Sequence, residues 1–166
     1  MQGVPAQCLK LSGSALKSLA FLMSGVLGCA GFFVSESVSA QNPKLIDYQI
    51  SADSVFEPLG GRVGVASRGA QIVQTRNGQC TLCHAIPGFN GQVGNLAPLL
   101  EGVGARLSAA QLRLRIINSS VLNPQTIMPS YYKVEGLVSV DPKWSGLPLM
   151  NEQQIEDVVA YLVTLK

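Results

Sequence analysis

The chain has 166 residues, a net charge of +2 and 47% hydrophobic residues. Residues 41–166 amount to one small domain whose charges nearly cancel, which excludes the basic stripe of a nucleic-acid-binding protein and a polybasic membrane patch. Only two of the four cysteines lie in this part of the chain, so a disulfide-rich scaffold is excluded as well.

The first 40 residues have the pattern of a secretory signal peptide. Two lysines precede an uncharged apolar run over residues 19–34, and small residues follow up to Ala40. We expect cleavage after Ala40, removal of residues 1–40 and a periplasmic location. The apolar run is shorter than the ~20 residues that span a bilayer, so we expect no stable membrane insertion. The apolar residues that follow Cys29 disfavour a lipid-anchor signal there.

Residues 41–64 show no helical period and contain several prolines and glycines, which predicts an extended N-terminal segment. The remaining domain is expected to comprise residues 65–166. At its start, apolar residues recur at helical spacing. This spacing predicts a first helix that Ser67 caps and that ends near Arg76, before Asn77-Gly78 breaks it.

The run Cys80-Thr81-Leu82-Cys83-His84 forms a C-x-x-C-H motif, the attachment signature of a c-type haem. Two thiols at this spacing can reach the two vinyl groups on one porphyrin edge, and the adjacent imidazole can reach the iron. A dithiol redox site would need only the two cysteines, usually near a βαβ pattern. A structural zinc site needs about four ligands, and His84 is the only histidine. A disulfide would leave His84 without a role.

A haem-ligating histidine needs a partner for its second ring nitrogen, which fixes its tautomer and orientation. Pro98 follows the motif in a glycine-rich region, and its carbonyl can accept a hydrogen bond. We consider this carbonyl the candidate partner of His84. A simple turn proline explains the residue equally well.

Ser108 is expected to start a second helix, from Ala109 to about Ser119. Its arginines, Arg113 and Arg115, are expected in solvent, although one of them could instead meet a haem propionate.

The last helix begins after Asn151, which forms a capping box with Gln154. Met150 is expected to staple onto this helix. The iron needs a second axial ligand if it only transfers electrons, and methionine is a common one. With Met150 explained as the staple, we predict Met128 as that ligand.

Several segments resemble the SoxX family of small bacterial cytochromes. The similar runs are Gln111–Ile116, Leu122–Tyr132, Gly146–Leu149 and Ile155–Leu165, and the likeness covers Asp47–Lys166. The resemblance implies an all-α, class I cytochrome c fold, with three main helices around one covalent haem c.

The resemblance also implies thioethers at Cys80 and Cys83 and axial ligands at His84 and Met128. Many relatives have Gly-Pro where this chain has Ala97-Pro98. The implied partner is a SoxA-like cytochrome in a heterodimer. That complex acts as an L-cysteine S-thiosulfotransferase, which oxidatively joins thiosulfate to a carrier-protein cysteine. Catalysis is then expected on the partner, while this chain passes electrons to a further acceptor, expected to be another cytochrome.

Two other functions fit the residues. A free, mobile periplasmic mono-haem cytochrome c would favour a charged docking face, which the near-neutral domain does not suggest. A haem-based sensor would need an open iron site, which Met128 would close. The aromatic and apolar residues of 131–149 suit either a partner interface or a cover for the haem edge.

Overall fold

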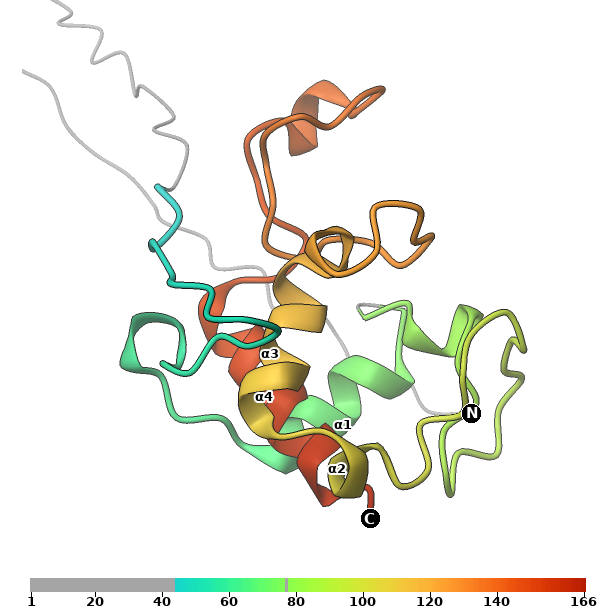
Figure 1. The fold of residues 1–166 in the computed structure, drawn as a ribbon. Coiled ribbons are helices and arrows are strands. Elements are labelled where there is room, and N and C mark those ends of the chain that lie inside the picture. The colour runs from blue at the N-terminus through green and yellow to red at the C-terminus, as the bar shows by residue number, and fades with distance from the viewer. Residues whose placement is uncertain (1–43, 77) are drawn as a thin grey trace, which may run out of the picture. The chain divides into compact units, whose positions relative to one another are not determined.

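The regular elements are helices throughout the part of the chain described by the computed structural model, which comprises residues 44–76 and 78–166 (Figure 1). The predicted signal peptide lies outside these residues. The described residues all belong to one compact unit, Ala40–Lys166. No helix in this part of the chain has the length and apolar character needed to cross a membrane.

Four α-helices and four short 3-10 turns make up the described regular structure. The helices are α1 (Ala66–Gln74), α2 (Val103–Arg106), α3 (Ala109–Asn118) and α4 (Glu152–Thr164). The turns are η1 (Leu59–Gly61), η2 (Cys80–Leu82), η3 (Ser119–Val121) and η4 (Pro142–Trp144). Long loops connect these elements, and Cys83, His84, Pro98 and Met128 all lie in these loops.

Helix α4 is central to the packing, because it contacts α1, α2, α3 and η1. Its apolar stripe is buried and faces buried side chains from the other helices, as expected for an amphipathic helix that covers a core. The buried stripe consists of Ile155, Val158, Val159 and Leu162. The segment before α1 also contributes to the core, since Val55 and Leu59 are almost fully buried.

The local start signals of α3 and α4 are confirmed. Ser108 and Gln111 form a capping box at α3, and Asn151 and Gln154 form another at α4. Met150, directly before the α4 cap, is buried in the core. Each capping box joins residues three positions apart, so the sequence pattern alone contains them.

The predicted start of α1 is wrong. Ser67 lies inside the helix and is exposed, while the N-cap position is Val65, which has no side chain able to cap. The amide of Val65 instead donates to Asp157 Oδ1 of α4 at 2.8 Å. A tertiary contact thus replaces the local cap. The helix also ends at Gln74, before the predicted Arg76.

The expectation that Arg113 is solvated is also wrong. Its side chain is 6% exposed and forms a two-pronged ion pair with Glu156 of α4, with Nε–Oε1 and Nη2–Oε2 both at 2.8 Å. Its Nη1 donates to the carbonyl of Val55 at 2.7 Å, and the amide of Leu59 donates to Glu156 at 2.9 Å. This pair therefore joins α3, α4 and the segment before α1.

Helices α1 and α4 approach closely where Gly69 faces α4. A Cβ added at Gly69 would lie 1.9 Å from the Asp157 carbonyl oxygen and 2.8 Å from Tyr161 Cβ. Both distances are below van der Waals contact, so any side chain at this position forces the helices apart.

We predict that Gly69→Ala lowers the free energy of unfolding by about 1–3 kcal/mol, the usual cost of overpacking a tight contact. Denaturant unfolding followed by circular dichroism would measure it. Ser67→Ala, an exposed change in the same helix, should alter stability by no more than about 0.5 kcal/mol. Equal stability of the two variants would contradict the close helix contact.

Asp157 is buried where α1 and α4 meet. Burial alone would raise its pKa, but hydrogen bonds from Arg68, the Val65 amide and Gln153 outweigh this effect and hold the pKa below its ordinary value of 3.8. Arg68 contributes the closest contact, with Nε 2.6 Å from Oδ2. A carboxyl group whose pKa is lowered by folding stabilises the folded state above its unfolded pKa and loses that effect as pH falls through its folded pKa.

We predict that Asp157→Asn reduces the stability that the protein loses on acidification below about pH 5. Unfolding midpoints measured from pH 7 to pH 3 would give this dependence. Asp141→Asn, at an exposed carboxylate, should retain the wild-type pH dependence. The assignment fails if the Asp157 variant has the same acid slope as the wild type.

Candidate functional site

The C-x-x-C-H loop forms a tight turn directly after α1. Gln79 has a left-handed backbone with φ of 56° and leads into η2. The amides of Cys83 and His84 both donate to the Cys80 carbonyl, at 3.2 and 2.9 Å. Cys80 and Cys83 are half-buried and unbonded to each other. This turn holds both thiols and the imidazole in one short stretch of fixed backbone.

His84 Nδ1 lies 2.6 Å from the carbonyl oxygen of Pro98. A carbonyl oxygen can only accept a hydrogen bond, so Nδ1 must carry the proton. The other ring nitrogen, Nε2, then has a free lone pair, as a metal ligand requires. Two further bonds hold the two segments together: Ala97 N donates to Cys83 O at 3.0 Å, and Leu100 N donates to Ala85 O at 3.0 Å.

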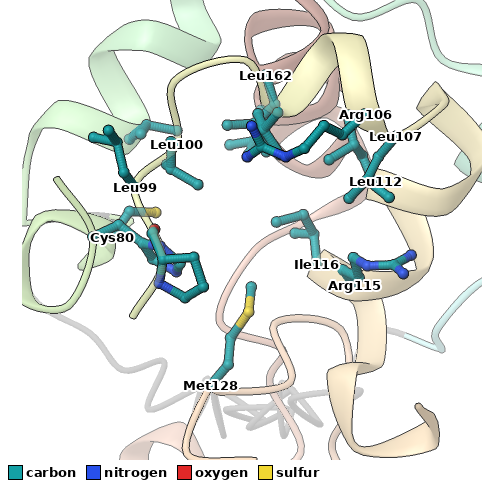
Figure 2. Close-up of a pocket in the computed structure, with 15 residues that line it drawn as sticks. Cys80, Leu99, Leu100, Arg106, Leu107, Leu112, Arg115, Ile116, Met128 and Leu162 are labelled. Carbon is teal, nitrogen blue, oxygen red and sulfur yellow. The ribbon is translucent and has the colours of Figure 1, made fainter. Parts of the chain in front are cut away.

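A cavity of about 380 Å³ lies beside His84 and Met128. Figure 2 shows Cys80, Arg106, Arg115 and Met128 around the same space, with the Met128 sulfur pointing into it. Its volume falls within the range of about 300–1,000 Å³ typical of ligand and cofactor sites. Aliphatic side chains from the loops and helices form most of the wall: Val73, Leu99, Leu100, Val103, Leu107, Leu112, Ile116, Val158 and Leu162.

A second hollow of about 460 Å³ shares Cys80, His84, Pro98 and Met128 with the first. Cys83 lines this second hollow. The five residues singled out from the sequence are therefore brought together in one region of the molecule.

Met128 is held by the end of α3. Ser119 Oγ donates to the Met128 carbonyl at 2.9 Å, and Thr126 Oγ1 accepts from the Met128 amide at 3.2 Å. Met150, the other methionine of residues 41–166, is 2% exposed in the core and lines neither hollow. Of the two sulfur atoms considered from the sequence, only that of Met128 borders the cavity.

Two arginines border the apolar cavity. Arg106 Nη1 donates to the Glu101 carbonyl at 2.7 Å, and Arg115 Nη1 donates to the Gln111 carbonyl at 2.9 Å. Arg115 was one of the two arginines considered for a haem propionate, whereas Arg106 was missed. Helix α2 has only four residues, too few for a periodic pattern, so the sequence held no clear signal that Arg106 faces the site.

Tyr131 and Tyr132, three and four residues after Met128, are both buried in the core. The Tyr131 hydroxyl donates to the Gly78 carbonyl at 2.6 Å, close to the attachment loop. Burial raises the pKa of Tyr131, so its hydroxyl stays protonated. The Tyr132 hydroxyl contacts Glu152 and accepts from the Ile46 amide at 2.9 Å. Neither ring belongs to an exposed surface.

These residues fit a covalently bound haem. The donor set is one imidazole nitrogen and one thioether sulfur, a pair that cytochromes c use. Two thiols stand beside the imidazole, the cavity wall is apolar, and two guanidinium groups could pair with the carboxylates of haem. An α-helical fold built around a C-x-x-C-H loop in this way defines a class I cytochrome c.

Comparison with known proteins leads to the same class. A model of the cytochrome c family matches residues 66–166. The chain is also similar to a chain in the crystal structure of SoxXA from P. pantotrophus, with 38% sequence identity and a TM-score of 0.65. The similarity covers 72% of this chain and 94% of that chain. No match was found among curated proteins.

The chain therefore belongs to the cytochrome c family and is a cytochrome of the SoxX type. Its fold is the all-α, class I cytochrome c fold that the sequence resemblance implied. Membership of this family implies a covalently bound haem c and a role in electron transfer.

Proposed function

We propose that this chain is the electron-transfer subunit of a periplasmic SoxAX-type complex, with a single haem c attached through Cys80 and Cys83 and ligated by His84 and Met128. The single observation that carries the ligand assignment is that His84 and Met128 border one apolar cavity. When bound, the haem supplies an iron that alternates between its ferric and ferrous states.

The protein's own residues would keep that haem in place and shield it. Pro98 fixes the His84 ring with Nε2 available, because its carbonyl accepts a hydrogen bond from Nδ1–H. The aliphatic wall would shield a bound haem from water, and ligation by the Met128 sulfur would raise its reduction potential. Arg106 and Arg115 can balance the negative charge of the haem carboxylates.

The partner in this proposal is a SoxA-like cytochrome. Three exposed aliphatic side chains border the hollow that Cys83 and Met128 line: Leu82, Leu96 and Ile127, which are 63%, 71% and 73% exposed. None of the residues that line this hollow carries a charged side chain. An uncharged apolar rim favours a lasting subunit contact over the charged, transient docking of a mobile carrier.

In this proposal, the complex oxidatively joins thiosulfate to a cysteine of a carrier protein. The partner subunit catalyses this reaction. This chain has no cysteine in residues 41–166 apart from the pair of the C-x-x-C-H motif. Cys80 and Cys83 are assigned to the haem, which leaves no thiol for a nucleophilic role. Electrons would then pass from this chain to a downstream acceptor, proposed to be another cytochrome.

The ligand assignment predicts the effect of Met128→Ala. The oxidised wild-type protein should show a weak absorption band near the red end of the visible spectrum, from sulfur-to-iron charge transfer, and the variant should lack it. The reduced variant should also bind carbon monoxide, because its iron has an open position. Met150→Leu, a change of similar volume in the core, is the matched control and should retain the band.

A band that survives Met128→Ala would contradict the assignment. If the wild-type protein itself lacked the band and bound carbon monoxide when reduced, the sensor function would become the better explanation.

The partner assignment predicts that Leu96→Lys weakens complex formation by about tenfold or more, because binding would bury an unpaired charge. Co-purification and titration with a SoxA-type subunit would measure this. The visible spectrum should stay unchanged. Val63→Lys, at an exposed aliphatic residue outside this rim, serves as control and should bind like the wild type.

The exposed Trp144 provides a second measurement on the same complex. Weaker binding of Trp144→Ala with an intact haem spectrum would extend the interface to the loop around η4. If wild-type protein purified with a SoxA-type subunit present shows no association, the mobile-carrier function is favoured.

A further inference from the structure

We infer that the Tyr131 hydroxyl is a positioning group, which holds the Met128 segment against the haem-attachment loop and so determines how firmly Met128 is retained as a ligand. The inference rests on the proposed ligation by Met128. It concerns a hydrogen bond between two loops that the sequence motifs do not connect.

The Met128 segment is anchored to α3 and, through the Met150 amide that donates to the Tyr131 carbonyl at 3.0 Å, to the residues just before α4. The amide of Tyr131 donates to the Ile116 carbonyl at 3.1 Å, and the amide of Tyr132 donates to the Ile117 carbonyl at 3.2 Å. Together with the bond from Ser119 to the Met128 carbonyl, these contacts fix the segment relative to α3. They do not connect it to the loop that carries His84.

The Tyr131 hydroxyl provides that connection. It donates to the Gly78 carbonyl at 2.6 Å, and Gly78 is itself fixed to the end of α1 through its amide, which donates to the Ile72 carbonyl at 3.0 Å. Among the described residues, the Tyr131 hydroxyl is the group whose hydrogen bonds join residues 78–100 to residues 119–150, with the Gly78 carbonyl and the Cys80 thiol as its partners. Gly78 lies two residues before Cys80, and Tyr131 lies three residues after Met128.

The chemistry of haem attachment makes this bond more important. The Cys80 thiol also donates to the Gly78 carbonyl, at 3.3 Å. A thioether sulfur carries no hydrogen and can only accept. Once Cys80 is attached to haem, Tyr131 is therefore the donor that remains for this carbonyl. Because Tyr131 and Gly78 are both buried, water cannot readily take its place.

Tyr132, the next residue along the chain, provides a matched control. It is buried like Tyr131, and its hydroxyl is also hydrogen-bonded, but to Glu152 and the Ile46 amide, not to the attachment loop. Loss of either hydroxyl removes a buried hydrogen bond and should lower global stability. Only loss of the Tyr131 hydroxyl should loosen Met128 specifically.

The test uses holoprotein with haem attached, in wild-type, Tyr131→Phe, Tyr132→Phe and Met128→Ala forms. Imidazole is titrated into each oxidised protein and its binding is followed in the visible spectrum, since it competes for the position that Met128 occupies. We expect Tyr131→Phe to bind imidazole roughly two- to tenfold more tightly than wild type, the range for one lost hydrogen bond. Tyr132→Phe should bind it like the wild type.

Denaturant unfolding of each variant checks that the phenylalanine forms are folded. Unchanged imidazole affinity in Tyr131→Phe would overturn the inference, as would an equal increase in both phenylalanine variants, which would indicate general loosening. Met128→Ala separates this failure from failure of the proposed ligation. If it leaves the spectrum and imidazole affinity unchanged, Met128 is not the ligand. If it changes both while Tyr131→Phe changes neither, only the positioning role fails.

Discussion

The close contact between α1 and α4 is the constraint on which the rest of the structure depends. Gly69 allows the two backbones to approach until no Cβ would fit between them. Two consecutive buried carboxylates of α4, Glu156 and Asp157, then bind different neighbouring helices. Asp157 binds the start of α1, and Glu156 binds Arg113 of α3. Since the C-x-x-C-H loop follows α1 directly and the Met128 segment follows α3, this contact sets the frame for both sides of the cavity.

The two sides of the site are built by different means. On the His84 side, a tight turn and the Pro98 carbonyl orient the imidazole within about twenty residues of chain. On the Met128 side, backbone bonds to the end of α3 hold the sulfur beside the cavity. The Tyr131 hydroxyl joins the two sides through Gly78. A buried hydrogen bond between two loops is well suited to limiting ligand movement, because, once Cys80 is attached to haem, opening this bond would leave the Gly78 carbonyl without a donor.

The surface near the site is consistent with a subunit that stays bound to its partner. A cytochrome that meets its partners briefly gains speed from a charged face. Here the side chains around the hollow near Cys83 are uncharged, and Leu96 and Ile127 are among the most exposed aliphatic residues described. Burying such side chains in a lasting complex removes apolar area from water. The protein thus combines the electron-transfer role of its family with a surface that favours a lasting complex with a partner subunit.

The sequence by itself determined what depends on neighbouring residues: the C-x-x-C-H motif, the start of α3 at Ser108 and the capping box of α4. It also contained the resemblance to SoxX, which covers most of the described chain. Only the tertiary structure decided that Asp157 replaces a local cap for α1, that Arg106 borders the cavity and that Arg113 is buried. Arg113 and its partner Glu156 are 43 residues apart, and no local pattern links residues at that distance. Their pairing arises from the packing of α3 against α4.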